Sequence, residues 1–245
     1  MASFERAQEI VEKLQDSGYT AVFAGGCVRD SLLDAEPHDY DIATNAAPDT
    51  IEEMFSKTIS IGKSSGVIVV VSEGEEFEVS TFREDGVVLH TSNGYKAMIV
   101  DAQRRDLTID GLFFNPINGE VYDFVSGQQD LRDRCIRFIG NPRKRIEEDK
   151  LRMLIAIRFA MKLDFEVELW SSNAIRDNIH KIKDVSTERI KDELCKMFVI
   201  NPSDALKWLN NFGALEFILP EVCAMIGGKE LLALGVEQGR YMGDV

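Results

Sequence analysis

The pattern of apolar residues changes near residue 140, and this change limits the possible folds more than any other feature. Before it, short β-prone runs alternate with helical segments, which predicts a mixed α/β domain over residues 1–140. After Pro142 almost every segment has helical periodicity, which predicts an all-α region over 141–222 and leaves a short remainder at 223–245. The expected helices of this second region are 143–163, 168–181, 186–199 and 202–212.

Within the first region, Ala7, Ile10, Val11 and Leu14 recur at helical spacing, so we expect the chain to open with an amphipathic helix. We interpret residues 84–98 as a mobile loop, because they combine two glycines with no stable period. The strands expected are 19–24, 38–42, 66–71, 77–82, 120–124 and 135–139, and the further helices are 28–33, one from Pro48 and 101–114.

Acidic residues outnumber basic ones by 42 to 28, for a net charge of −14. This balance argues against a generic nucleic-acid binder, which needs clustered Lys and Arg over its surface. Residues 130–162 nevertheless carry 10 basic and 5 acidic residues, so an anionic partner could bind one face.

The four cysteines lie far apart, with no C-x-x-C pair, so we expect reduced thiols, no disulfide framework and no zinc site. The start lacks an apolar leader, and no apolar run approaches 18 residues. We therefore expect a cytoplasmic protein with no membrane association.

Two glycines, Gly25 and Gly26, stand between an expected strand and an expected helix. Their small size would let the backbone approach a phosphate, which the helix N-terminus favours and Arg29 could bind. An ordinary glycine turn with a salt-bridged arginine explains this motif equally well.

Asp39 and Asp41 alternate with Tyr40, so a strand would place both carboxylates on one face. Close like charges repel, and a hard divalent cation such as Mg²⁺ would relieve the repulsion. Glu78 is a possible third ligand, with Glu75 and Glu76 as competitors, whereas the alternative for the pair is a solvated strand end.

Two further charged groups are candidates for nucleotide binding. Arg104, Arg105 and Asp106 could form a fork for phosphate or ribose, or simply an exposed turn. On one continuous helix Asp149 and Arg152 would lie within about 60° of each other, as a binding pair or an ordinary ion pair, and Arg158 would face the opposite side from Asp149.

Five motifs in this order resemble the class II tRNA nucleotidyltransferases (CCA-adding enzymes) and the related bacterial poly(A) polymerases, over roughly residues 1–222. They are Gly-Gly-x-Val-Arg-Asp at 25–30, Asp-x-Asp at 39–41, Arg-Arg-Asp-Leu-Thr-Ile at 104–109, Glu-Asp-x-Leu-Arg at 148–152 and Thr-Glu-Arg-Ile-x-x-Glu-Leu at 187–194.

The resemblance implies a polymerase-β-like nucleotidyltransferase head and a helical neck, with metal-dependent addition of C and/or A from CTP and ATP to tRNA 3′ ends. It implies that Asp39 and Asp41 are catalytic and bind two Mg²⁺ ions. It also implies that Arg189 and Glu193 support the neck helix. The nucleotide-binding residues it implies are Gly25, Gly26, Arg29, Arg105, Asp106, Asp149, Arg152 and Arg158.

Two departures from the family pattern stand out. Ile155 replaces a common arginine, and residues 219–221 run almost directly into the glycine motif at 227–235, so most of the body and tail are missing. The alternatives are a bacterial poly(A) polymerase, or a non-catalytic RNA-binding relative, which would have no use for Asp39 and Asp41.

Overall fold

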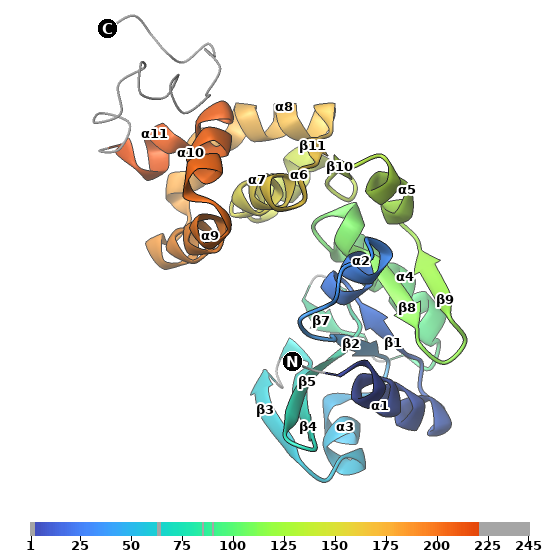
Figure 1. Ribbon diagram of the computed structural model, residues 1–245. Helices are drawn as coiled ribbons and strands as arrows, with labels where there is room; N and C mark the ends of the chain where they lie inside the picture. The colour runs from blue at the N-terminus through green and yellow to red at the C-terminus, as the bar shows by residue number, and fades with distance from the viewer. Residues whose placement is uncertain (1–2, 63–64, 85, 90, 221–245) are drawn as a thin grey trace, which may run out of the picture. The chain divides into compact units, whose positions relative to one another are not determined.

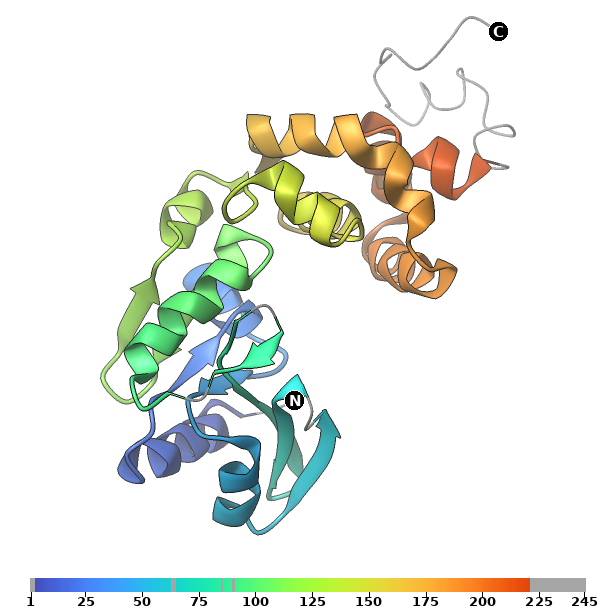
Figure 2. The ribbon, with the colours of Figure 1, turned by 180° about the vertical axis from the view of Figure 1, so that it is seen from behind.

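The computed structural model describes residues 3–62, 65–84, 86–89 and 91–220 (Figures 1 and 2). The chain divides into two compact units between Leu131 and Arg132. The first contains a mixed sheet with helices and the second is almost entirely helical, which confirms the predicted change of class. No helix among the described residues is both long and apolar enough to cross a membrane.

The first unit is built on a seven-stranded sheet with the order β3-β4-β5-β2-β1-β8-β9. Every neighbouring pair is antiparallel except β2 and β5, which run parallel. The strands are β1 (Ala21–Ala24), β2 (Ile42–Thr44), β3 (Thr58–Gly62), β4 (Val67–Ser72), β5 (Glu75–Thr81), β8 (Leu112–Asn115) and β9 (Glu120–Asp123), and a separate hairpin comprises β6 (Arg83–Glu84) and β7 (Val87–Val88).

Helices cover both faces of this sheet. Side chains alternate along β1, and all four of them are buried, so each face of the strand is covered. Val22 and Ala24 lie in one buried cluster with Met98 of α4, whereas Phe23 contacts Phe4 of α1 on the other face. The expected inner face of α1 is fully buried. The helices are α1 (Phe4–Asp16), α2 (Gly26–Leu32), α3 (Pro48–Met54), α4 (Gly94–Arg104), the 3₁₀ turn η2 (Thr108–Asp110) and α5 (Gly127–Arg132).

The expected loop at 84–98 and helix at 101–114 are both partly wrong. The hairpin β6–β7 begins the loop region, and α4 begins at Gly94 because the Asn93 side chain accepts from the N–H of Lys96. The helix ends at Arg104, and residues 112–115 form β8, which pairs with both β1 and β9.

The second unit packs its helices beside a short parallel pair of strands, β10 (Cys135–Ile136) and β11 (Glu166–Val167). Its helices are α6 (Pro142–Glu148), α7 (Arg152–Leu163), α8 (Leu169–Asn178), the 3₁₀ segment η3 (Ile179–Asp184), α9 (Thr187–Ile200), α10 (Pro202–Asn211) and α11 (Leu215–Ile218). The remainder at 223–245 lies outside the described residues.

The expected helix 143–163 is wrong as a single element, since it is divided into α6 and α7. Asp149 has an extended backbone (φ −151°, ψ 109°), and its carboxylate accepts from the N–H of Leu151 at 3.1 Å. Such a local side-chain bond competes with helix continuation.

Candidate functional site

The glycine turn after β1 brings backbone and arginine into close contact. Gly25 has φ +73°, and a Cβ on it would lie 2.9 Å from Nη1 of Arg105. Gly26 begins α2, as expected for a helix opening directly after the turn. The positive φ favours glycine, and the absence of a side chain leaves room for Arg105.

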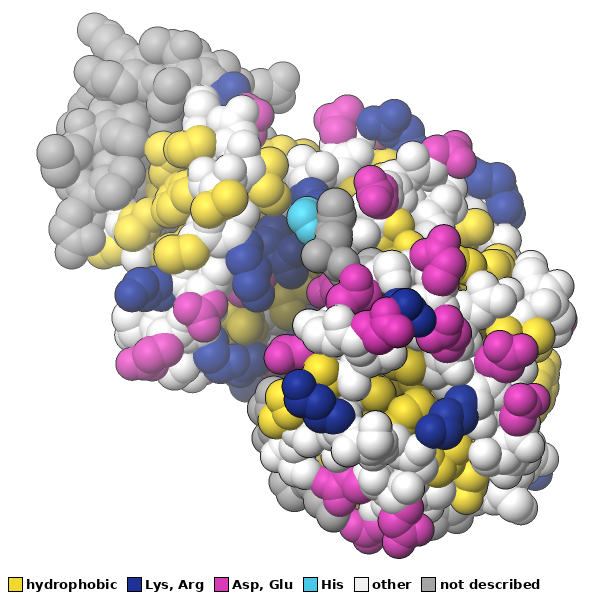
Figure 3. All heavy atoms as spheres, turned by 60° about the horizontal axis from the view of Figure 1, so that its bottom comes forward, with side chains coloured by type: hydrophobic (Ala, Val, Ile, Leu, Met, Phe, Trp, Pro, Cys, Tyr) yellow, Lys and Arg dark blue, Asp and Glu magenta, His cyan; other side chains and the backbone are white. Residues whose placement is uncertain are grey.

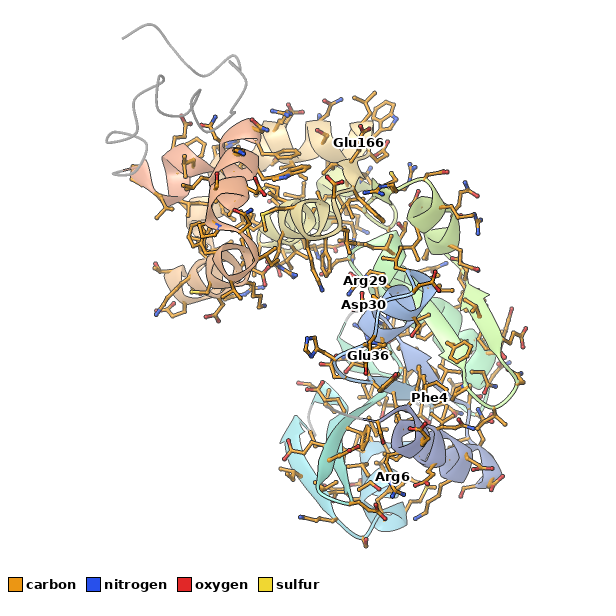
Figure 4. The ribbon with its side chains drawn as sticks, viewed as in Figure 1. Phe4, Arg6, Arg29, Asp30, Glu36 and Glu166 are labelled. Atoms are coloured by element: carbon orange, nitrogen blue, oxygen red, sulfur yellow. The ribbon has the colours of Figure 1, made fainter. Side chains whose placement is uncertain are left out.

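Arg29 is anchored by acidic partners rather than presented to solvent. Its side chain is 5% exposed, its Nε donates to Asp30 at 2.7 Å, and its Nη1 contacts Asp110 (Figure 4 labels Arg29 and Asp30 on α2). Two carboxylates already balance its charge. The contact with Asp110 links α2 to η2.

Arg105 is held at the end of α4 by partners from two sides. Its Nε donates to Oδ2 of Asp101 at 3.1 Å and its Nη1 donates to the carbonyl of Asp110 at 3.2 Å, while its guanidinium lies over the Phe113 ring. Asp101 is 1% exposed. A buried carboxylate thus orients Arg105 toward the glycine turn. Asp106 follows it, half-buried.

Asp39 and Asp41 precede β2 instead of lying within a strand, so the expected strand 38–42 is wrong at this point. The carbonyl of Asp41 still accepts from the N–H of Ala24 at 2.9 Å, which fixes this segment beside the end of β1. Regular pairing with β1 starts only at Ile42. Asp39 and Asp41 therefore lie just before the strand, with buried Tyr40 between them, and the charge of Asp39 acts on Asp41.

The carboxylate of Asp41 is repelled by two other carboxylates, those of Asp39 and Glu78. Burial, followed by the charges of Asp39 and Glu78, raises the pKa of Asp41 to about 6, and the positive charge of Arg105 opposes the rise. Oxygen donors with excess negative charge fit a hard divalent cation. Glu75, by contrast, accepts from the N–H of Ser3, which leaves Glu78 the better third donor.

No three His, Cys, Asp or Glu side chains within the described part of the chain are already grouped closely enough to hold a metal ion. Coordination by Asp39, Asp41 and Glu78 would therefore require their side chains to move together. Like charges favour the separation of such carboxylates.

In the second unit, Asp149 is paired with Arg189. Arg189 makes two bonds to the carboxylate, of 3.2 and 2.7 Å, whereas Arg152 donates to Glu148 and to the carbonyl of Arg145, both at 2.7 Å. The expectation of an i,i+3 pair on one helix is wrong, because Asp149 lies outside α7.

Asp149 nevertheless remains near Arg152. Burial would raise the pKa of Asp149, but the hydrogen bonds from Arg189 and from the N–H of Leu151, with the charge of Arg152, hold it below its ordinary value. The carboxylate is therefore an ionised acceptor beside two guanidinium groups.

Arg158 joins α7 to α9. Its Nε donates to Glu193 at 2.6 Å, and Glu193 also accepts from Lys196 at 2.6 Å. Glu193 is 4% exposed, so it is a buried carboxylate satisfied by two cations. Sequence reasoning missed the carboxylates that position the arginines of the first unit, although the i,i+4 spacing of Asp101 and Arg105 was a visible signal.

Comparison with known families extends these observations. Residues 21–137 match the family described as poly A polymerase head domain, and residues 164–226 match the probable RNA and SrmB-binding site of polymerase A. The CCA-adding enzyme of Ligilactobacillus salivarius is 40% identical over 210 residues, which are 83% of this chain and 52% of that protein. This chain belongs to the tRNA nucleotidyltransferase and poly(A) polymerase family.

Other members of the nucleotidyltransferase family agree. The CCA-adding enzyme of Staphylococcus epidermidis is 38% identical, over 88% of this chain and 55% of its own length. The Bacillus stearothermophilus CCA-adding enzyme in complex with CTP aligns with a TM-score of 0.82 and 35% identity, over 94% of this chain and 56% of that one. This chain therefore spans about half the length of the relatives it matches.

The Thermotoga maritima CCA-adding enzyme complexed with tRNA aligns with a TM-score of 0.76 over 89% of this chain and 52% of that one. Its identity is 21%, so it supports the fold alone. Together the alignments confirm the expected polymerase-β-like head followed by helices.

Proposed function

We propose that this chain carries the nucleotidyl-transfer part of an enzyme that adds C and A from CTP and ATP to tRNA 3′ ends and releases pyrophosphate in the cytoplasm. The observation that supports it best is the coupled group of Asp39, Asp41 and Glu78 beside the Gly25 turn and Arg105. The similarity to CCA-adding enzymes, one of them in complex with CTP, supports the choice of substrates.

Asp39 and Asp41 would hold Mg²⁺, most simply two ions, with Glu78 as a possible further ligand. When bound, the metal would lower the pKa of the RNA 3′-hydroxyl and balance the charge of the leaving pyrophosphate. The chain's own groups would position the nucleotide: the turn at Gly25 and Gly26 and the guanidinium of Arg105 would contact its phosphates.

Arg29 would act with the same phosphates only indirectly, by fixing the start of α2 to Asp110, since its charge is already balanced. Asp106 directly follows Arg105, and we assign it to the ribose side of the nucleotide. Arg158 would position α7 through Glu193 rather than touch the nucleotide.

Base selection would rest on Asp149 and Arg152. Cytosine and adenine present an amino donor where uracil and guanine present a carbonyl, so an ionised acceptor beside a donor favours CTP and ATP. The bond from Arg189 to Asp149 keeps that acceptor ionised and oriented. We assign residues 1–140 to the nucleotidyltransferase head and 141–222 to the neck.

The test is direct incorporation by this chain. We would supply CTP and ATP separately, with Mg²⁺, to tRNAs ending in the discriminator base, in C and in CC, and sequence the products. We expect C and A at defined positions, and loss of incorporation in Asp39→Asn and Asp41→Asn. Asp34→Asn, an exposed carboxylate between α2 and β2, is the matched control and should retain activity.

Three outcomes would count against the proposal. Extended A tracts on unrelated RNA would identify a poly(A) polymerase instead, a reading favoured by the name of the head-domain family. RNA binding without incorporation would indicate a non-catalytic relative. Full activity in Asp41→Asn would remove the assigned metal site.

A further inference from the structure

Arg83 stands where β5 passes into the hairpin β6–β7, and its charge has no acidic partner in the described residues. Its backbone N–H donates to Oδ1 of Asp101 at 3.0 Å, and its Nη1 donates to the carbonyl of Ser65 at 3.1 Å. Its Nε is buried and finds no acceptor in the part of the chain that the structure describes. Among the described residues, neither Nε nor Nη2 of Arg83 makes a hydrogen bond, so the Nε–Nη2 edge of the guanidinium has no acceptor from that part of the chain.

The surroundings make this arrangement costly. Burial lowers the pKa of Arg83, the charges of Arg104 and Arg105 lower it further, and Asp101 alone opposes them. The carboxylate of Asp101 is itself engaged by Arg104 at 2.6 Å and by Arg105 at 3.0 Å. A half-buried cation thus faces two others across one shared anion.

A buried polar group without a partner calls for a physical explanation, and a role in binding a substrate is one of them. The Nε–Nη2 edge of arginine matches two oxygens of a phosphate group. Arg105 connects this position to the proposed catalytic carboxylates, since its charge acts on both Arg83 and Asp41. Arg83 would therefore extend the group of positive charges that includes Arg104 and Arg105, and a phosphate bound there would offset their mutual repulsion.

We propose that Arg83 binds a phosphate group of a substrate, either the polyphosphate of the nucleotide or a phosphodiester near the RNA 3′ end. The inference rests on the proposed function and adds a substrate-contacting residue to it. Because Nε is closed off in the ligand-free chain, binding must displace part of the hairpin β6–β7. Amide hydrogen exchange at Val87 and Val88 should change when the anion binds.

The experiment uses inorganic tripolyphosphate as the probe, with binding measured by calorimetry, so it requires no turnover. If the nucleotide supplies the phosphate, we expect Arg83→Gln to weaken tripolyphosphate binding by about tenfold or more and Arg83→Lys to have an intermediate effect. Val88→Ala, which loosens the strand paired with Arg83 but keeps the charge, is the matched control. It should bind at least as tightly as wild type, because the hairpin is then easier to displace. Because repulsion is removed, the Tm of Arg83→Gln should not fall.

Steady-state kinetics separate the two phosphate sources. If the nucleotide supplies the phosphate, Arg83→Gln raises KM for CTP; if the RNA supplies it, tripolyphosphate binding is unchanged and only KM for the RNA rises. Equal losses of tripolyphosphate binding in Arg83→Gln and Val88→Ala would overturn the inference. So would a lower Tm of Arg83→Gln with no change in either KM or in tripolyphosphate binding. Normal tripolyphosphate binding through Arg83 in a chain that never incorporates nucleotides would instead refute the proposed function alone.

Discussion

At the scale of single residues, the raised pKa of Asp41 is the clearest sign that this position favours a bound cation. Its pKa of about 6 means that, without a counter-ion, folding brings its carboxylate into surroundings that favour the protonated form. The unfolded chain, where aspartate titrates near its ordinary value, has no such preference. The cost of ionised Asp41 is therefore a property of the folded, metal-free protein.

The first prediction concerns this cost. A folded pKa above the unfolded one contributes stability below about pH 4 that is lost as pH rises through about 6. In EDTA, Asp41→Asn should gain on the order of 1–3 kcal/mol relative to wild type between pH 4 and pH 7.5. Urea denaturation at both values measures it, and Mg²⁺ at pH 7.5 should stabilise only the wild type. Parallel pH curves for the two proteins would contradict the assignment.

The second prediction concerns Asp149. If its carboxylate accepts from the amino group of the base, Asp149→Ala should reduce the preference for CTP and ATP over UTP and GTP by about 1–3 kcal/mol of discrimination. Arg152→Ala should raise KM for the preferred nucleotides. Measured kcat/KM for all four nucleotides tests this, with Glu147→Ala, an exposed carboxylate of α6, as the control. An unchanged ranking would mean that Asp149 serves only its ion pair with Arg189.

At the level of elements, α5 depends on one close approach. Asp123 caps its start by accepting from the N–H groups of Gly127 and Gln128, and a Cβ on Gly127 would lie 2.2 Å from the carbonyl oxygen of Thr108. Backbone lies on both sides of this contact, so no side chain can move aside. The hydroxyl of Thr108 also donates to buried Asp130 at 2.6 Å, which holds α5 against η2.

The third prediction follows from that contact. Gly127→Ala should destabilise the first unit by about 1–3 kcal/mol through overpacking, even though alanine is the better helix former. Gln128→Ala is the control, because only the backbone N–H of Gln128 takes part in the cap. Denaturant melts followed by far-UV circular dichroism compare the two. Equal midpoints would show that η2 can shift away at little cost.

The elements that could be predicted are those whose own residues show a clear apolar period or a clear turn. The period of Ala7, Ile10, Val11 and Leu14 locates α1, and the turn around Gly74 locates the hairpin β4–β5. The start of α4 could not be found this way. Asn93-Gly94 looks like a turn, but Gly94 is required because a Cβ there would lie 2.0 Å from Oγ1 of Thr20, a contact from a distant part of the chain.

The candidate site divides in the same way. Gly25, Arg105, Asp39 and Asp41 could be named from local motifs, and their roles stay predictions. The partner that fixes Arg29 is Asp110, which lies 81 residues away along the chain, so no local pattern could reveal that its charge is already balanced. The break at Asp149 was missed because leucine and isoleucine keep a helical period across it.

Across the whole molecule, the basic segment 130–162 is less positive than its own residues suggest, because acidic residues from elsewhere in the sequence pair with it. In the lower part of Figure 3, Asp and Glu side chains are spread over the first unit. The basic segment 130–162 is partly neutralised by acids that lie beyond it. Its ion pairs of this kind are Arg134–Asp164, Arg137–Glu168, Arg143–Asp177 and Arg158–Glu193.

The fourth prediction concerns RNA affinity. Lys144 and Lys162 are exposed cations of that segment with no ion pair among the described residues, so Lys144→Glu and Lys162→Glu should weaken binding of all tRNAs alike and reduce its dependence on salt. Filter binding or fluorescence anisotropy over a salt series measures both effects. Lys57→Glu, at an exposed position in the first unit, is the matched control. A salt-independent affinity in the wild type would show that another surface binds the RNA.

The single parallel pair in the sheet has a consequence for how the protein folds. Strands β3, β4 and β5 form a meander from neighbouring segments, whereas joining β5 to β2 closes the longer connection over residues 45–74, which carries a larger entropy cost. Glu78 meets Asp39 and Asp41 only when that connection closes. Electrostatic repulsion therefore opposes the pairing of β5 with β2, and a divalent cation should speed refolding as well as stabilise its product.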